Sequence, residues 1–155
     1  MPRTAADARV YPLPCLTRGR LLRAARKANI DISRFIFSGP VMPKTEHLKR
    51  LTLADMYLDT HVYNGHTTGS DALWAGVPMV TLQGDSFPSR VGASLARAVG
   101  MPEMVTETWH EYEELAVGLG NNPDKLKAWR YPPAAWNTQF VTLIIQPFQL
   151  RRCND

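Results

Sequence analysis

The sequence predicts a single α/β domain: a Rossmann-like parallel sheet with helices on both faces. Short apolar segments of three or four residues alternate with longer helical segments, and Gly, Pro and Asn mark the turns between them. This alternation is typical of right-handed βαβ units, whose parallel sheet is covered on both faces. The length of 155 residues is enough for one domain with a hydrophobic core and too short for two.

The elements can be assigned in order along the chain. Apolar residues at helical spacing predict the first helix at 20–29. The second helix, 43–53, opens with Pro43 at the first helical position, which proline favours. The third starts at Thr67 or Thr68, whose hydroxyl can accept from the free N–H groups of the first turn. Two further helices are predicted at 90–99 and 109–119, and strands at 35–37, 56–58, 79–82 and 104–106.

The basic residues concentrate at the amino terminus. Residues 1–30 hold seven of the 18 Lys and Arg residues and one acid, whereas the rest of the chain has 11 basic and 13 acidic residues. A nucleic-acid surface would run along the fold itself, so this distribution argues against one. The leader could be an Arg-rich organelle transit peptide. Helical spacing in 20–29 instead favours a poorly ordered segment, 1–19, followed by a helix with a basic face.

Membrane spans and thiolate sites are disfavoured. No apolar run approaches the roughly 20 residues that a membrane-spanning helix needs. Cys15 and Cys153 lie near opposite ends of the chain and neither belongs to a CxxC pair. This usage disfavours a disulfide framework and a thiolate metal site, and it fits a reducing compartment.

The stretch YNGHTTGSDALWAGVPMV, residues 63–80, is the strongest candidate for a site. It follows a predicted strand, and parallel sheets bind ligands beyond the carboxyl ends of their strands. Thr67 and Thr68 could donate to phosphate oxygens from a helix N-terminus, with His66 as a further donor and Asp71 facing ribose hydroxyls. The alternative is structural: one threonine caps the helix and Asp71 is a first-turn acid favoured by the helix dipole. The dinucleotide fingerprint GxGxxG is absent.

A second group of candidates lies on the preceding helix. Lys44, His47 and Arg50 recur at three-residue spacing. His47 neighbours apolar residues, so its ring could be partly buried for structural reasons or could stack on a base. Arg90, near the start of a later helix, is poorly placed for the helix dipole, which indicates either a bound partner or an ordinary surface residue.

Four segments together resemble one known family. They are PVMPKTEHLKR, LADMYLDT, YNGHTTGSDALWAGVPMVTLQGDSFPSRVGAS and HEYEELAVGLGNN. In this order they resemble the carboxyl-terminal part of the catalytic region of the nucleocytoplasmic protein O-GlcNAc transferases, bacterial relatives included. The resemblance covers about 20–130, with a fainter echo at 135–138. It implies one lobe of a GT-B fold, catalysis without metal or cofactor, UDP-GlcNAc as the donor, and Ser or Thr hydroxyls of intracellular proteins as acceptors.

The resemblance also implies roles for individual residues. The Met42 backbone, His47 and Arg50 would hold the uracil, and Lys44 would lie near the ribose. His66, Thr67 and Thr68 would bind the diphosphate, and Asp71 the ribose. Catalytic residues are expected in the amino-terminal lobe, which the chain does not match, and a lysine that the family brings to the pyrophosphate from upstream has no counterpart.

The sequence predicts three segments of the chain and leaves two alternatives for its function. Residues 1–19 form a basic leader, 20–131 a UDP-sugar-binding lobe, and 132–155 a divergent tail. The expected function is the donor-binding lobe of a cytoplasmic protein O-GlcNAc transferase (nuclear too, if eukaryotic), inactive without the missing lobe or an oligomer. The alternative is a non-catalytic UDP-sugar-binding or protein-interaction module. Fragment, truncation and degenerate paralogue all fit the sequence.

Overall fold

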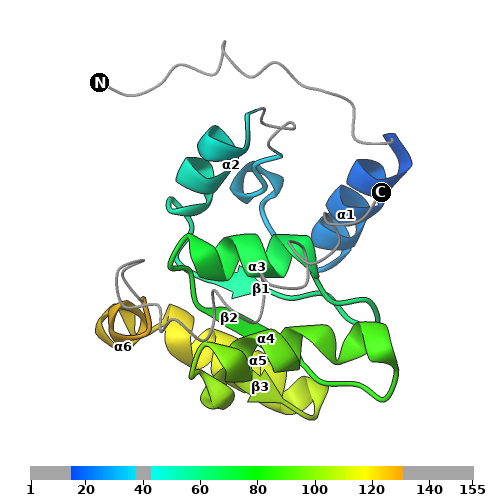
Figure 1. Ribbon diagram of the computed structural model, residues 1–155. Coiled ribbons are helices and arrows are strands. Elements are labelled where there is room, and N and C mark those ends of the chain that lie inside the picture. The colour runs from blue at the N-terminus through cyan, green and yellow to red at the C-terminus, as the bar shows by residue number, and fades with distance from the viewer. Residues whose placement is uncertain (1–14, 38–42, 131–155) are drawn as a thin grey trace, which may run out of the picture. The chain divides into compact units, whose positions relative to one another are not determined.

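The computed structural model describes residues 15–37 and 43–130 (Figure 1). Met42, most of the predicted leader 1–19 and the predicted tail 132–155 lie outside the described residues. The chain divides into two compact units, Met1–Pro43 and Lys44–Asp155.

The first unit contains helix α1, Cys15–Lys27, and a short 3₁₀ helix, Ile32–Arg34. Asp31 caps the 3₁₀ helix by accepting from the Ser33 backbone N–H at 2.9 Å. The expected strand at 35–37 is wrong, since these residues join no sheet. The rings of Phe35 and Phe37 stack on each other instead, with centroids 6.4 Å apart, and Ile36 is 91% exposed. Apolar residues alone do not form a strand, because a strand needs a neighbour with which to exchange hydrogen bonds.

The second unit is built on three parallel strands. Tyr57 of β1 pairs with Met79 of β2, and Thr81 of β2 pairs with Val105 of β3, in the order β1-β2-β3. The strands are β1 Tyr57–Leu58, β2 Met79–Leu82 and β3 Val105–Thr106; the helices are α2 Lys44–Leu51, α3 Thr67–Trp74, α4 Val91–Ala98, α5 Trp109–Gly120 and α6 Pro123–Ala128, with 3₁₀ turns at Phe87–Ser89 and Pro102–Met104. The predicted class, a parallel sheet with helices, is confirmed.

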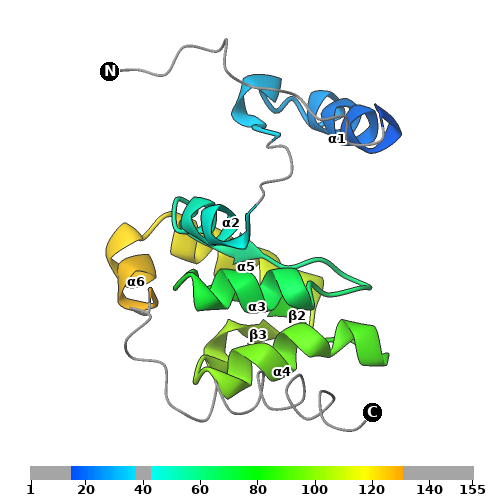
Figure 2. The same ribbon diagram turned by 45° about the horizontal axis from the view of Figure 1, so that its top comes forward.

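Helices cover both faces of the central strand. All four residues of β2 are buried. In Figure 2, α3 and α4 lie in front of the strands and α5 lies behind them, and all three helices contact β2. Leu73, Met79, Met104 and Leu119 are fully buried in the resulting core. The sheet is therefore a rigid support for the loops at its edges.

Helix α6 is absent from the sequence prediction, whose last helix is 109–119. Asn122 starts this helix, because its side chain accepts from the Lys125 N–H at 3.0 Å and Pro123 takes the first helical position. Within the described part of the chain, no helix is long and apolar enough to cross a membrane.

Helix α4 approaches the sheet very closely at Gly92. A methyl group at this position would overlap Asp59 Oδ2 and Thr81 Oγ1. The backbone of α4 can therefore come this close to the two side chains only because residue 92 has no side chain of its own. Gly118, inside α5, offers a contrast, because a methyl group there would meet no atom within 4 Å.

We expect Gly92→Ala and Gly118→Ala to have opposite effects on stability. Gly92→Ala should lower the free energy of unfolding by about 1–3 kcal/mol through overpacking. Gly118→Ala should raise it by about 0.5–1 kcal/mol, because alanine loses less backbone entropy in a helix. Thermal unfolding of the two variants beside the unchanged chain measures both, and a stabilised Gly92→Ala protein would contradict the close approach.

Candidate functional site

The site is built on the buried carboxylate of Asp59, the residue that follows β1. Asp59 is 5% exposed. Its Oδ1 accepts from the backbone N–H groups of Thr60 at 2.9 Å and Gly65 at 2.7 Å, and its Oδ2 accepts from Thr81 Oγ1 at 2.7 Å. Both ends of the loop between β1 and α3 are thereby attached to β2.

Tyr112 of α5 makes a further hydrogen bond to Asp59, at its backbone. Its hydroxyl donates to the Asp59 carbonyl oxygen at 3.0 Å. Burial, and to a smaller extent the charge of Asp59, raises the pKa of Tyr112 to about 12. The phenol is therefore protonated at neutral pH and can donate this hydrogen bond.

Asn64 attaches the loop to α4. Its side chain is buried; Nδ2 donates to the Thr60 carbonyl at 2.8 Å, and Oδ1 accepts from the Gly92 N–H at 3.0 Å. The Asn64 N–H donates to the Pro88 carbonyl at 2.9 Å. Neither Asp59 nor Asn64 was among the residues predicted from the sequence. An acid directly after an apolar strand, and an asparagine inside a polar loop, were the available signals.

The first turn of α3 is not capped by a side chain. His66 occupies the N-cap position and makes no capping hydrogen bond. The expected threonine cap is therefore wrong: Thr67 and Thr68 are the first two helical residues, and both are exposed. Their hydroxyls do not cap the helix, and they lie at the helix end where the dipole favours anions.

His66 lies in an aromatic cluster beside that turn. Its ring stacks on Tyr63, with centroids 4.7 Å apart, and meets the edge of Phe87 at 6.2 Å. His66 Nε2 is buried and has no hydrogen-bond partner within the described residues. A buried polar atom without a partner is uncommon in a folded protein, and it marks His66 as a candidate ligand contact.

Side chains of α2 converge on Asp71 of α3. Lys44 Nζ forms an ion pair with Asp71 Oδ2, and His47 Nε2 lies 3.4 Å from the same oxygen. Arg50 Nη2 lies 3.2 Å from His47 Nδ1. The Asp71 side chain is 13% exposed. The structure thus brings together four of the predicted residues, Lys44, His47, Arg50 and Asp71. Met42 lies outside the described part of the chain.

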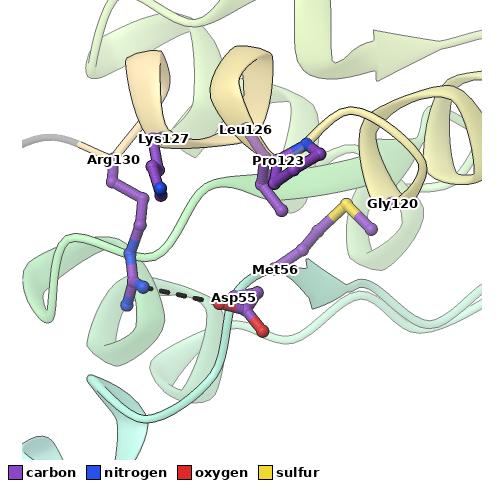
Figure 3. A pocket seen from close by; sticks show the side chains of 7 residues that line it. All are labelled: Asp55, Met56, Gly120, Pro123, Leu126, Lys127 and Arg130. Atoms are coloured by element: carbon purple, nitrogen blue, oxygen red, sulfur yellow. Dashed lines mark ion pairs between the residues drawn. The ribbon is translucent and has the colours of Figure 1, made fainter.

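A pocket of about 290 Å³ lies elsewhere (Figure 3). Asp55 and Met56 line it just before β1, whereas Thr67, Thr68 and Asp71 lie on α3, which follows β1. Arg130 donates to the carbonyls of Thr52 at 2.7 Å and Ala54 at 2.9 Å, and it pairs with Asp55 at 3.6 Å. These contacts fasten the end of α6 to the connection between α2 and β1, which is a structural role. In the described segments, no group of three His, Cys, Asp or Glu side chains could hold a metal ion.

Comparison with known proteins gives a consistent result. The model of glycosyl transferase family 41 matches residues 10–142. A Caenorhabditis elegans UDP-N-acetylglucosamine–peptide N-acetylglucosaminyltransferase is 50% identical over 101 residues, which are 65% of this chain and 9% of that protein. A probable enzyme of the same name, SEC from Arabidopsis thaliana, is 44% identical over 119 residues, which are 76% of this chain and 12% of that protein.

A solved structure is also similar. A mutant of the Thermobaculum terrenum O-GlcNAc transferase matches with a TM-score of 0.73 and 34% identity, over 88% of this chain and 27% of that one. This likeness agrees with the predicted resemblance to one lobe of a GT-B glycosyltransferase. The chain spans only a small part of each of these relatives.

Removing the Asp59 carboxylate should destabilise the fold strongly. Asp59→Ala leaves the Gly65 N–H, the Thr60 N–H and the Thr81 hydroxyl without their acceptor, and hydrogen bonds to charged groups contribute about 1.5–3 kcal/mol each. We expect a loss of at least about 3 kcal/mol of unfolding free energy in urea titrations. Asp85→Ala, the same charge change at an exposed loop residue, is the control and should stay within about 0.5 kcal/mol. Equal stability of the two variants would contradict the anchoring role.

Proposed function

The chain belongs to glycosyl transferase family 41, and we propose that it is the donor-binding lobe of a cytoplasmic protein O-GlcNAc transferase. The lobe corresponds to residues 20–131. The donor is UDP-GlcNAc, and the acceptors are Ser and Thr hydroxyls of intracellular proteins. The observation that carries the proposal is the convergence of Lys44 and His47 on Asp71, next to an α3 N-terminus without a side-chain cap.

The amino end of α3 supplies the diphosphate subsite of this proposal. The exposed N–H groups of the first turn and the helix dipole favour negative charge. Thr67 and Thr68 are exposed at the same turn, and His66 Nε2 has no partner in the described segments. These groups stabilise the charge that develops on the diphosphate when its bond to the anomeric carbon breaks.

Helix α2 and Asp71 supply the uridine subsite. Lys44 and His47 hold the Asp71 carboxylate in one orientation, and its remaining lone pairs accept from the ribose hydroxyls. The half-buried ring of His47, steadied by Arg50 through Nδ1, offers a face for the uracil. The Met42 backbone contact is carried over from the family resemblance alone.

This part of the enzyme binds the donor without transferring the sugar. Glycosyl transfer needs the acceptor hydroxyl held against the anomeric carbon, and such positioning contributes roughly 7–11 kcal/mol in favourable cases. In a GT-B enzyme both lobes contribute to it, and the chain spans 9% and 12% of the length of the Caenorhabditis elegans and Arabidopsis thaliana relatives. The amino-terminal lobe, or an oligomer, is therefore a required partner in this proposal.

We expect the chain to prefer UDP to ADP and GDP in calorimetry. Asp71→Ala should weaken UDP binding by about 1.5–3 kcal/mol, as for the loss of a charged hydrogen bond. Asp124→Ala removes the same charge from an exposed residue of α6 and should leave the affinity unchanged. Equal affinity for the three nucleotides would contradict the uridine subsite.

The purified chain should bind UDP yet show no turnover with UDP-GlcNAc and an acceptor peptide. Loss of a single donor to a developing oxyanion commonly lowers the rate about 10²–10³-fold, and these 155 residues span only 9% and 12% of the length of two relatives. The double variant Thr67→Val/Thr68→Val serves as the negative control. Turnover by the unchanged chain that this variant lacks would overturn the expectation of inactivity.

A further inference from the structure

Tyr57 reaches from the sheet to the first turn of α3. Its hydroxyl lies 3.3 Å from Thr68 Oγ1. The Tyr57 backbone N–H donates to the Pro78 carbonyl at 2.9 Å, and its ring packs against the hydrophobic core. The hydroxyl therefore projects from a rigid strand toward a residue of the proposed diphosphate subsite.

Gly65 leaves the space in which the two hydroxyls meet. A methyl group on residue 65 would overlap the Tyr57 hydroxyl and would lie 2.7 Å from Thr68 Oγ1 and 3.2 Å from the Gly69 nitrogen. Any larger side chain would separate Tyr57 from Thr68. Glycine at this position thus permits the contact.

The hydroxyls of α3 have different partners. Ser70 Oγ donates to the His66 carbonyl, four residues back, at 3.0 Å. A threonine hydroxyl in a helix can likewise bond a carbonyl of the preceding turn, so helical threonines adopt two side-chain rotamers. Thr68 Oγ1 is held instead by Tyr57.

We propose that Tyr57 is a positioning residue that orients the Thr68 hydroxyl toward the donor diphosphate. Either hydroxyl could donate across this contact; in this proposal the phenol O–H donates the hydrogen bond to Thr68 Oγ1, and the single hydrogen of Thr68 then points outward to a phosphate oxygen. Burial raises the pKa of Tyr57 above its ordinary value, so the phenol is protonated at neutral pH. This inference rests on the proposed function and adds a residue that binds no ligand itself.

The test separates phosphate recognition from nucleoside recognition. We expect Tyr57→Phe to weaken UDP binding to the full chain about three- to tenfold, within the range of a neutral hydrogen bond, and to leave uridine affinity within twofold. In a Thr68→Val background, Tyr57→Phe should have no further effect on UDP. Ser70→Ala, which removes a hydroxyl bonded back to the helix, is the matched control and should bind UDP normally. Thermal unfolding of each variant checks that the fold is retained.

The outcomes distinguish this inference from the function on which it rests. A chain that binds no UDP contradicts the proposed function and this inference with it. Normal UDP binding by Tyr57→Phe overturns the inference alone. Equal weakening of UDP and uridine, or a Tyr57→Phe effect that persists beside Thr68→Val, would also overturn it, because Tyr57 would then act on the fold rather than through Thr68.

Discussion

The buried carboxylate of Asp59 is the interaction on which the rest of the site depends. A charged group in a hydrophobic core is costly unless hydrogen bonds replace its hydration. Here the donors come from the loop before α3 and from the central strand, and Tyr112 of α5 binds the carbonyl of the same residue. Satisfying one buried charge therefore fixes the loop, the sheet and a helix relative to one another. The amino end of α3 is located by these bonds and not by a capping side chain.

The polar groups of this edge are of two kinds, buried residues bonded within the protein and exposed hydroxyls on α3. Asp59 and Asn64 are buried and their hydrogen bonds are made within the protein. Thr67 and Thr68 are exposed on the next turn. Because the construction is completed by buried residues, the exposed hydroxyls are not needed to hold the helix. Such preorganisation suits a site that must present donors without rearranging when charge develops.

The sequence predicts the fold best where the pattern is local. The apolar run 79–82 and the helices at 90–99 and 109–119 correspond to β2, α4 and α5, because buried strands and amphipathic helices carry their own periodicity. The segment 35–37 looked equally apolar, but a strand depends on a partner that no local pattern reveals. The residue types of the site could be found from the stretch 63–80 and from the family resemblance. The roles of Asp59, Asn64 and Tyr57 could not be derived from such local signals alone, since their contacts join β1 and its loop to α3, to α4 and to β2.

Helix α2 has eight residues and fully buries none of them. A helix this short is not stable in isolation, so its attachment depends on side-chain contacts with α3, among them those of Lys44 and His47 with Asp71. Such an element belongs to the least stable part of a fold, where amide hydrogens exchange with solvent through local opening. A ligand held between α2 and α3 would bind only the form in which α2 is folded against α3, and it would slow the exchange of the α2 amide hydrogens. Occupancy of the site and the local folding of α2 are in this way a single coupled equilibrium.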